Sequence, residues 1–441
     1  MTVSDQILGH GSHGTMVFKG TFENRPVAIK RLLLDFYDVA HHEVKILRDS
    51  DQHQNVIRYF YQEQTERFMY IALELCPASL ADVIENHSPE MSNIRATLKP
   101  RPVLSQIMSG MQYLHSLKLV HRDIKPQNIL IGESHGRLRG AHPRILISDF
   151  GLCKRLAEDQ SSFHNTHTAG GTLGWRAPEC MINQKSGAGG GGGENGGSGS
   201  DSEQSQWVLL APSQKMRITK SIDIFSAGCV FFYFLTGGVH PFGDKFTREI
   251  NILRGNHRLD RLDALLDGGV EAKDLIKRMI FKDPKKRPDS TAVLQHPYFW
   301  SSNKKLAFLQ DVSDRLESEE RDPPSAILKQ LERGAAKVVG PDWTRRLDRR
   351  ILEDMGKFRK YDGRTVQDLL RAMRNKKHHY QDLSTELKGV LGDLPDGFFS
   401  YFTSKFPGLF MHVYHMVSEN KGLRGESLFV PFFDAEERHR H

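Results

Sequence analysis

Two short motifs constrain the fold of this 441-residue chain more than any other feature. They are HRDIKPQN at 121–128 and DFG at 149–151. In phosphoryl transfer, an aspartate at the position of Asp123 accepts the proton of the attacking hydroxyl group. Asn128 and Asp149 supply oxygen ligands that hold Mg²⁺ against the phosphates of a nucleotide. The order and spacing of the motifs therefore predict a fold that transfers phosphate from ATP.

The segments before these motifs complete a nucleotide site. In LGHGSHGTMVFKG the glycines let the backbone approach phosphates closely, although a tight hairpin alone would also use them. VAIK ends at Lys30, which holds phosphates if Glu43 on the following helix fixes its position. The strand FMYIALEL ends in the hinge that would meet adenine. The residues that we expect to bind the nucleotide are Gly9, Gly11, Gly14, Val17, Ala28, Lys30, Glu43, Glu74, Cys76 and Asn128.

The joint pattern over residues 5–299 resembles the eukaryotic protein kinase family. Lys125 would neutralise the transferring phosphate and is typical of serine/threonine kinases rather than tyrosine kinases. The resemblance implies that Asp223 in SIDIFSAGC supports the catalytic loop and that Arg287 pairs with Glu179 of APE. The alternative is a kinase-shaped scaffold without catalysis. Such scaffolds usually lack the lysine or one of the aspartates, and all of them are present here, so we expect an active enzyme.

Hydrophobic periodicity predicts two lobes within these residues. Residues 5–75 alternate as strands around one helix at 39–49, which gives a small N-terminal lobe. A helical lobe follows at about 77–299. The apolar segments with helical spacing are 103–118, 222–236, 272–281 and 291–300. A glycine- and serine-rich stretch at 181–216 interrupts this lobe, and we expect it to be disordered because it has too little apolar surface to bury.

The segment between DFG and APE offers candidate phosphorylation sites. Ser161 and Ser162 lie in a polar run, and a phosphate there would pair with Arg122. We predict these two serines as phosphosites. Thr166, Thr168 and Thr172 are further candidates.

A second domain is expected at 303–434, with helical patterns at 304–333 and 364–380. Residues 345–380 contain 12 Lys or Arg and 5 Asp or Glu, so their excess equals the +7 net charge of the whole chain. A positive patch of this kind favours a polyanionic partner.

The chemistry of this domain concentrates in LLRAMRNKKHHY at 369–380. On a helix, Asn375 and His379 would share a face with Arg374 beside it, and Tyr361 precedes them on an expected loop. Metal-free RNA cleavage needs a proton acceptor, a proton donor and a cation for the phosphate, and histidine suits the proton role. No carboxylate cluster suits a metal pair, which disfavours a two-metal nuclease. Taken alone, the segment favours a solvated basic face or a simple phosphate binder over a catalytic site.

The whole pattern, from Ile7 to about Phe433, resembles the inositol-requiring serine/threonine kinase/endoribonucleases of the unfolded protein response. The segments that carry this resemblance are NVIRYF, IALELC, ISDFGLCK, DIFSAGCVF, HPFG, FLQDVSDRLE and DLLRAMRNKKHHY. The insertion and the phrase RDPPSAIL are most similar to fungal members. The resemblance implies an α+β fold, in which a bilobal kinase is followed by a small all-helical ribonuclease domain of the KEN type.

The resemblance also implies a mechanism. Tyr361 matches the family's general base, Arg374 and Asn375 match its phosphate-contacting pair, and His379 matches its general acid. ATP or ADP and Mg²⁺ serve the kinase, and the nuclease needs no cofactor. Phosphorylation in trans and a back-to-back homodimer, or a larger oligomer, prepare the enzyme to cut a stem-loop mRNA for unconventional splicing, leaving a 2′,3′-cyclic phosphate. DNA is not an expected partner.

Family members carry a lumenal sensor and one transmembrane helix upstream, and their kinase lies on the cytosolic face of the endoplasmic reticulum. We expect the present chain to be soluble. Its four scattered cysteines, Cys76, Cys153, Cys180 and Cys229, fit a reducing compartment. Two alternatives stay open. One is the oligoadenylate-dependent ribonuclease, whose kinase is degenerate. The other is a plain serine/threonine kinase with a basic tail that only docks on RNA or a membrane.

Overall fold

The computed structural model describes residues 1–11, 14–34, 37–133, 142–157, 163–164, 171–182, 217–265, 267–357 and 359–433. The chain divides into two compact units. The first comprises Met1–Leu262 and Leu275–Leu294, and the second comprises Asp263–Asp274 and the residues from Gln295 onward. This division differs from the expected boundary between 299 and 303, because a short segment before Leu275 folds with the C-terminal residues.

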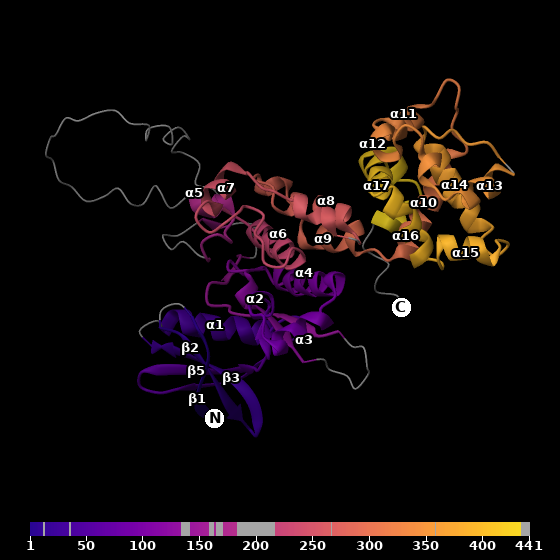
Figure 1. Ribbon diagram of the computed structural model, residues 1–441. Helices are drawn as coiled ribbons and strands as arrows, with labels where there is room; N and C mark the ends of the chain where they lie inside the picture. Colours follow the sequence, from indigo (N-terminus) through magenta and orange to yellow (C-terminus); the bar gives the residue numbers. More distant parts are fainter. Residues whose placement is uncertain are drawn as a thin grey trace, which may run out of the picture. The chain divides into compact units, whose positions relative to one another are not determined.

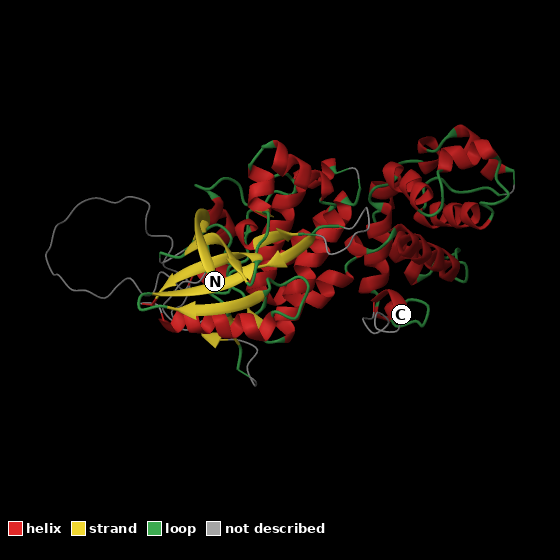
Figure 2. Cartoon of the chain, turned by 90° about the horizontal axis from the view of Figure 1, so that it is seen from below, coloured by secondary structure: helices red, strands yellow, loops and turns green. Residues whose placement is uncertain are grey.

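The first unit begins with a five-stranded antiparallel sheet in the order β1-β2-β3-β5-β4 (Figure 1). Its strands are β1 (Thr2–His10), β2 (Met16–Phe22), β3 (Arg25–Leu33), β4 (Tyr59–Gln64) and β5 (Phe68–Glu74). Helix α1 (Tyr37–Ser50) follows β3, close to the expected position. Figure 2 shows the strands gathered in the N-terminal part of the chain, whereas most of the remainder is helical.

Strand alternation explains how this sheet presents functional side chains. Val27 and Ile29 are fully buried in a core that they share with Ala72. Because successive side chains of a strand point to opposite faces, Ala28 and Lys30 point the other way. Val17 lies opposite Lys30 in the β2–β3 register. The sheet therefore groups three predicted nucleotide-binding residues on one surface.

The rest of the first unit is mainly helical. Its helices are α2 (Leu80–Glu85), α3 (Pro89–Thr97), α4 (Pro100–Ser116), α5 (Pro178–Ile182), α6 (Ser221–Leu235), α7 (Arg248–Arg254), the second half of α8 (Gly269–Met279) and α9 (Ser290–Gln295). Helix α6 is buried at every residue from Ile222 to Tyr233, as expected for a helix that is apolar all round. A Cβ at Gly228 would lie 2.7 Å from a methyl group of Ile280, so only glycine allows this close packing.

Short strands position the two catalytic motifs. β6 (Ala78–Ser79), β8 (Ile129–Gly132) and β9 (Arg144–Ile147) form a three-stranded sheet. β7 (Leu119–Val120) pairs with β10 (Lys154–Arg155), and β11 (Phe163–His164) pairs with β12 (Arg217–Ile218). The HRDIKPQN segment therefore lies between β7 and β8, and DFG lies between β9 and β10. Paired strands on both sides hold the two motifs in place.

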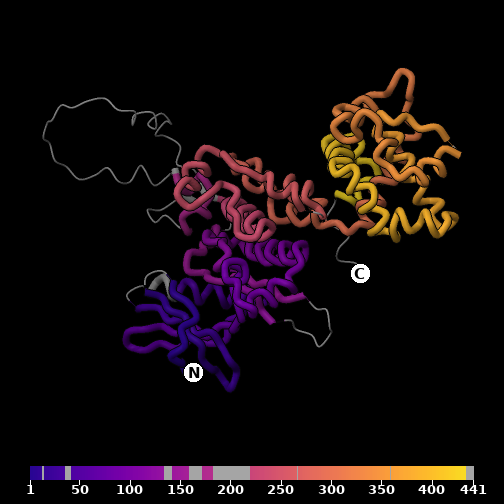
Figure 3. The backbone as a smooth tube through the Cα atoms, in the orientation of Figure 1, coloured from indigo at the N-terminus to yellow at the C-terminus, as the bar shows by residue number. Residues whose placement is uncertain are grey.

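The described elements of the second unit are helices, which Figure 3 traces from orange to yellow. They are the first half of α8, α10 (Ser302–Leu316), α11 (Ala326–Glu332), α12 (Ala335–Val339), α13 (Arg349–Gly356), α14 (Val366–His378), α15 (Thr385–Leu391), α16 (Asp396–Lys405), α17 (Leu409–Glu419), α18 (Lys421–Arg424) and α19 (Val430–Phe433). Their core contains fully buried aromatic side chains, among them Trp343, Phe308, Phe398 and Phe402. The expected architecture, a β-rich lobe and a helical lobe followed by a small helical domain, is confirmed.

Two expected helices are shorter than the sequence pattern suggests. The helical pattern at 304–333 is divided, because Pro323 and Pro324 lack the N–H groups that a continuous helix needs. The segment 291–300 is α-helical only to Gln295, since His296 precedes Pro297 and takes an extended conformation, and a single 3-10 turn follows at Pro297–Phe299. Over the described residues, no helix combines the length and the apolar character needed to cross a membrane.

Candidate active sites

The first site is organised around Lys30 of β3. Its ammonium group donates to Glu43 of α1 at 2.6 Å and to Asp149 of DFG at 2.8 Å. Burial by itself lowers the pKa of Lys30, but the charges of Asp149 and Glu43 outweigh it and hold the pKa above the ordinary value. The Lys30 charge in turn lowers the pKa of Asp149 to about 2. Lys30 and Asp149 therefore form an ion pair at neutral pH.

Three residues hold Asp123, two from the catalytic loop and one, Thr172, from the segment before APE. One carboxylate oxygen accepts hydrogen bonds from the backbone N–H and the hydroxyl of Thr172, both at 2.7 Å. The other lies 2.8 Å from the ammonium group of Lys125, which also donates to the Thr172 hydroxyl at 2.7 Å. The Asn128 amide donates to the same carboxylate at 3.1 Å. These contacts fix the carboxylate where a substrate hydroxyl would approach.

The loop itself is anchored by Asp223. Its two carboxylate oxygens accept the backbone N–H groups of His121 and Arg122, each at 2.8 Å, and one oxygen contacts His115 at 3.0 Å. Arg122 has a φ of 71° and Asp149 a φ of 66°, a left-handed region that non-glycine residues rarely adopt. Backbone strain of this kind clusters at functional sites, where the surrounding structure holds it.

A second expected contact is also present. The Arg287 guanidinium donates to both carboxylate oxygens of Glu179, at 2.6 and 2.8 Å, and both side chains are buried. This bidentate pair fixes the segment that begins at APE.

The glycine-rich segment is described apart from residues 12 and 13. Gly9 lies at the end of β1, and the Gly11 N–H donates to the carbonyl of Thr15 at 2.8 Å. Gly14 has a φ of 73°, which favours glycine. The hinge residue Glu74 pairs with Arg144 at 3.0 Å, and burial raises the pKa of the half-buried Cys76 to about 12.

In the second unit, Tyr361 and Asn375 come together across 14 residues of sequence. The Asn375 amide of α14 donates to the Tyr361 hydroxyl at 3.0 Å. The Asn375 carbonyl oxygen accepts from the Arg374 guanidinium at 3.2 and 3.3 Å. Three of the four residues that sequence reasoning selected therefore form one hydrogen-bonded group.

Helix α10 supplies a feature that the sequence did not reveal. The Arg374 guanidinium lies 3.0 Å from Asp314 on α10 and 3.1 Å from Glu317, the residue that caps the C-terminus of α10. The Arg374 side chain is only 10% exposed, so these carboxylates occupy a large part of its hydrogen-bonding capacity. An incoming phosphate would have to compete with them.

His379 lies just beyond α14, which ends at His378 rather than continuing to 380 as expected. Its backbone N–H still bonds to the Asn375 carbonyl at 3.1 Å, so it follows that residue by one turn. The imidazole is 74% exposed and contacts Asp382 at 3.3 Å. Among the described residues, no hydrogen bond joins this imidazole to Tyr361, Arg374 or the Asn375 side chain.

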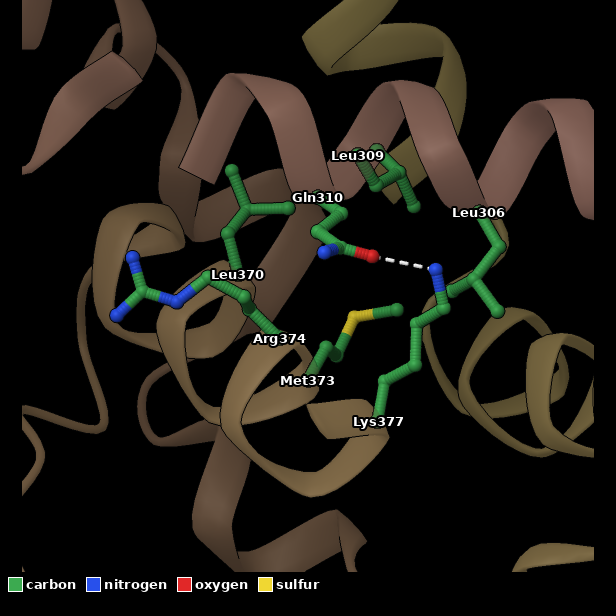
Figure 4. Close-up of a pocket in the computed structure, with 7 residues that line it drawn as sticks. All are labelled: Leu306, Leu309, Gln310, Leu370, Met373, Arg374 and Lys377. Atoms are coloured by element: carbon green, nitrogen blue, oxygen red, sulfur yellow. Dashed lines mark hydrogen bonds between the residues drawn. The ribbon is translucent and has the colours of Figure 1, made fainter. Parts of the chain in front are cut away.

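A small cavity lies between α10 and α14 beside this group (Figure 4). Its lining residues are Leu306, Leu309, Gln310, Leu370, Met373, Arg374 and Lys377. Among these lining residues Lys377 donates to Gln310, whereas the Arg374 guanidinium is turned away from that bond. Burial lowers the pKa of Lys377.

Several expectations lie outside the described residues. These are the phosphosites Ser161 and Ser162, the further candidates Thr166 and Thr168, and residues 183–216 of the insertion expected at 181–216. Residues 181 and 182 belong instead to helix α5 (Pro178–Ile182), which continues past APE. Thr172, another candidate phosphosite, is described, and its hydroxyl is engaged by Asp123 and Lys125. Sequence reasoning missed this positioning role, although the place of Thr172 a few residues before APE was a usable signal.

Comparisons with known proteins agree with this geometry. Residues 2–190 and 207–299 match the protein kinase domain family, and residues 305–433 match the family described as ribonuclease 2-5A. The chain belongs to the protein kinase family. A protein kinase domain implies the use of ATP and Mg²⁺.

Curated relatives place the chain more closely. It is 48% identical over 440 residues to a serine/threonine-protein kinase/endoribonuclease of Aspergillus fumigatus. The aligned region covers 94% of this chain and 37% of that relative. It is 46% identical to the sensor for unfolded proteins in the ER of Schizosaccharomyces pombe, with 95% of this chain and 38% of that relative aligned. It is 44% identical to a serine/threonine-protein kinase/endoribonuclease of Homo sapiens, with 98% of this chain and 42% of that relative aligned. The resemblance to kinase/endoribonucleases is confirmed. The chain spans about two fifths of the length of these relatives.

Proposed function

We propose that this chain is a bifunctional enzyme, a serine/threonine protein kinase and an endoribonuclease that cleaves stem-loop mRNA. The observation that carries the second activity is the Tyr361–Asn375–Arg374 group, which joins a hydroxyl, an amide and a guanidinium on one surface. The match of residues 305–433 to a ribonuclease family favours this function over a kinase with a docking tail.

The kinase half has the parts for phosphoryl transfer. Asp123 accepts the proton of the substrate hydroxyl, and Lys125 neutralises charge on the phosphoryl group as it moves. Lys30, held by Glu43, positions the nucleotide phosphates. The carboxylate of Asp149 and the amide oxygen of Asn128 are the hard oxygen donors that Mg²⁺ prefers, so these residues fit the ion. When bound, Mg²⁺ neutralises the negative charge of the phosphates.

RNA cleavage follows from the second group. In its ionised form, the Tyr361 oxygen takes the proton of the ribose 2′-hydroxyl, and the 2′-oxygen attacks the adjacent phosphorus. Arg374 and Asn375 hold the phosphate oxygens through charge-assisted and amide hydrogen bonds. His379 gives a proton to the leaving 5′-oxygen as its bond to phosphorus breaks. The products are a 2′,3′-cyclic phosphate and a 5′-hydroxyl, and these residues account for the reaction without a cofactor.

The exposure of His379 fits this role. An imidazole that is 74% exposed, one turn beyond Asn375, is free to meet an RNA strand bound across the end of α14. Its weak contact with Asp382, at 3.3 Å, is of the exposed kind that contributes little energy.

The biological setting is part of the proposal. A relative named as a sensor for unfolded proteins in the ER supports a role in the unfolded protein response. We assign unconventional mRNA splicing as the process and the cytosolic face of the endoplasmic reticulum as the location. We place a second copy of the chain as the partner for phosphorylation in trans at Ser161 and Ser162 and for a back-to-back homodimer or larger oligomer. Stem-loop RNA is the substrate.

One experiment separates the possibilities. The protein is loaded with nucleotide, transferred into chelator and given a stem-loop RNA, and the product ends are determined. We expect cleavage with a 2′,3′-cyclic phosphate end. RNA binding without cleavage, in protein that had phosphorylated itself beforehand, would leave only a kinase with a docking domain.

A further inference from the structure

Helix α1 is joined to the segment directly after DFG at two places. The Nε2–H of His42 donates to the backbone carbonyl of Cys153 at 2.8 Å. The Arg155 guanidinium donates to the carboxylate of Asp49 at 2.6 Å. His42 and Asp49 lie about two turns apart on α1, so they share one face of the helix. That face therefore meets the segment 153–155 at two separate points.

The same segment is fixed to both catalytic motifs. Its residues Lys154 and Arg155 form β10, which pairs with β7, and HRDIKPQN begins at the residue that follows β7. The N–H of Cys153 donates to the carbonyl of Phe150 in DFG at 3.0 Å, and the Cys153 side chain is buried. The contacts of His42 and Asp49 thus fix α1 relative to both motifs.

The residue next to His42 on α1 is Glu43, which accepts from Lys30 at 2.6 Å in the nucleotide site. The Glu43 carboxylate is buried, and a Cβ at Gly151 of DFG would lie 3.5 Å from it. A small shift of α1 would part this carboxylate from Lys30 and leave a buried charge without its cation. The place of α1 therefore decides whether the lysine that holds the nucleotide phosphates is in position.

Apolar packing sets that place less sharply. The apolar side chains that α1 buries include Val44, Ile46 and Leu47. Hydrophobic burial is non-directional, so it holds a helix against its neighbours without selecting one exact position along them. Hydrogen bonds have preferred distances and angles, and the contacts of His42 and Asp49 supply this directional restraint.

We infer that His42 and Asp49 are positioning residues for phosphoryl transfer, acting through Glu43 and Lys30. The inference rests on the proposed kinase function. His42 has the larger effect, because its partner is a backbone group close to DFG. The Asp49–Arg155 pair is exposed on both sides, at 43% and 44%, and exposed ion pairs contribute less.

The main test compares His42→Ala with His42→Gln in steady-state phosphorylation of a peptide by the full chain. The alanine variant loses the hydrogen bond to Cys153, so α1 leaves its working position part of the time, and we expect a kcat about 3- to 10-fold lower. The glutamine variant keeps an N–H donor, and we expect a kcat within about 2-fold of the native one. Asp49→Asn should show a smaller loss than His42→Ala.

A matched control and a double-mutant cycle separate positioning from stability. Lys45 is an exposed residue of the same helix, so Lys45→Ala should phosphorylate the peptide like the native chain. In a Glu43→Gln background, His42→Ala should add little further loss, because the contact that it supports is already weakened. An equal loss in both backgrounds, or no rescue by glutamine, would overturn the inference. An equal loss in Lys45→Ala would overturn it as well.

Failure of the proposed function gives a different result. If Asp123→Asn transfers phosphate at the native rate, the kinase function assigned to this site is wrong and the inference falls with it. If Asp123→Asn is inactive while His42→Ala and Asp49→Asn are native-like, only the positioning inference is wrong.

Discussion

Arg374 donates a hydrogen bond to Asp314 at 3.0 Å, from the helix that carries the proposed RNA-cleaving residues to the helix that packs beside it. The Asp314 carboxylate is 46% exposed, so the pair is open to solvent on one side. A phosphate group that binds Arg374 takes the place that this carboxylate holds. The proposed site therefore contains its own competitor for the substrate.

Asp314→Asn should tighten RNA binding. The change removes one negative charge from the site, and an exposed ion pair is worth about 0.2–1 kcal/mol, so we expect a dissociation constant about 2- to 5-fold lower at low salt. Salt screens exposed charges, so the difference should shrink at high salt. Fluorescence titration of a labelled stem-loop RNA at two ionic strengths measures it.

Asp263→Asn is the charge-matched control. Asp263 pairs with Lys273 at 2.6 Å and has no contact with Arg374, so this variant should bind RNA like the native chain. Weaker binding by Asp314→Asn would mean that Asp314 holds Arg374 in its productive position instead of competing for it.

His379→Ala should stop RNA cleavage and spare phosphorylation. Loss of a general acid costs about 10²- to 10⁴-fold in rate, and replacement of a side chain that is 74% exposed leaves stability within about 0.5 kcal/mol. Gel-based cleavage, radiolabelled phosphate transfer and thermal unfolding of the same preparation measure the three quantities.

The neighbouring histidine provides the control for that experiment. His378 is exposed and contacts Gln310 at 2.6 Å, so His378→Ala should retain cleavage. Equal loss in both variants would point to a general effect of basic charge. Loss of phosphorylation in His379→Ala would contradict separate sites for the two activities.

Acid should destabilise the first unit through His240. Burial holds the pKa of this imidazole well below its ordinary value, and nearby Arg248 lowers it further. The unfolded chain binds a proton at this residue below pH 6.5 and the native chain does not, so stability falls as pH falls from 6.5 toward the depressed native pKa. The slope for one group is at most about 1.4 kcal/mol per pH unit.

His240→Asn tests this linkage. The His240 ring accepts the Phe242 N–H at 3.2 Å, and asparagine retains an acceptor without the titration. Denaturant unfolding between pH 7 and 5 should give a flatter stability profile for this variant. The exposed His87→Asn serves as the reference, and an unchanged slope in His240→Asn would assign the acid sensitivity to other groups.

The sequence carried the local parts of both sites. The glycines, Lys30, Asp123 and Asp149 stand in short motifs, and a motif keeps its chemistry wherever the fold places it. Helix α14 could be predicted because the apolar residues Val366, Leu370 and Met373 recur at helical spacing among charged residues. The pairing of Glu179 with Arg287 could be expected only from the resemblance to kinases, since 108 residues separate them.

What the sequence could not supply was pairing between distant segments without a motif. Asp314 precedes Arg374 by 60 residues, and one acidic residue on a helix resembles any other. The Trp343–Tyr361 contact and the hydrogen bond from Asp362 to Asp368 likewise depend on how a loop closes onto a helix. The predicted helix ends were also imprecise. His379 lies outside α14 because the turn that follows ends the helix, and hydrophobic periodicity does not reveal where such a turn begins.

Thr172→Ala should slow phosphorylation although no nucleotide-binding residue changes. The hydroxyl of Thr172 donates to Asp123 and accepts from Lys125, both at 2.7 Å, so it fixes the relative position of the proton acceptor and the phosphate-neutralising lysine. We expect a kcat about 10- to 100-fold lower with the KM for ATP little changed, because misplacement affects the chemical step more than nucleotide binding.

Thr172→Ser keeps the hydroxyl and should restore the rate to within about 3-fold. Thr172→Glu, which would mimic a phosphate if this residue were a phosphosite, places a second carboxylate against Asp123 and should be inactive. Steady-state phosphorylation of a peptide measures all three variants, and an active glutamate variant would restore Thr172 to the candidate phosphosites.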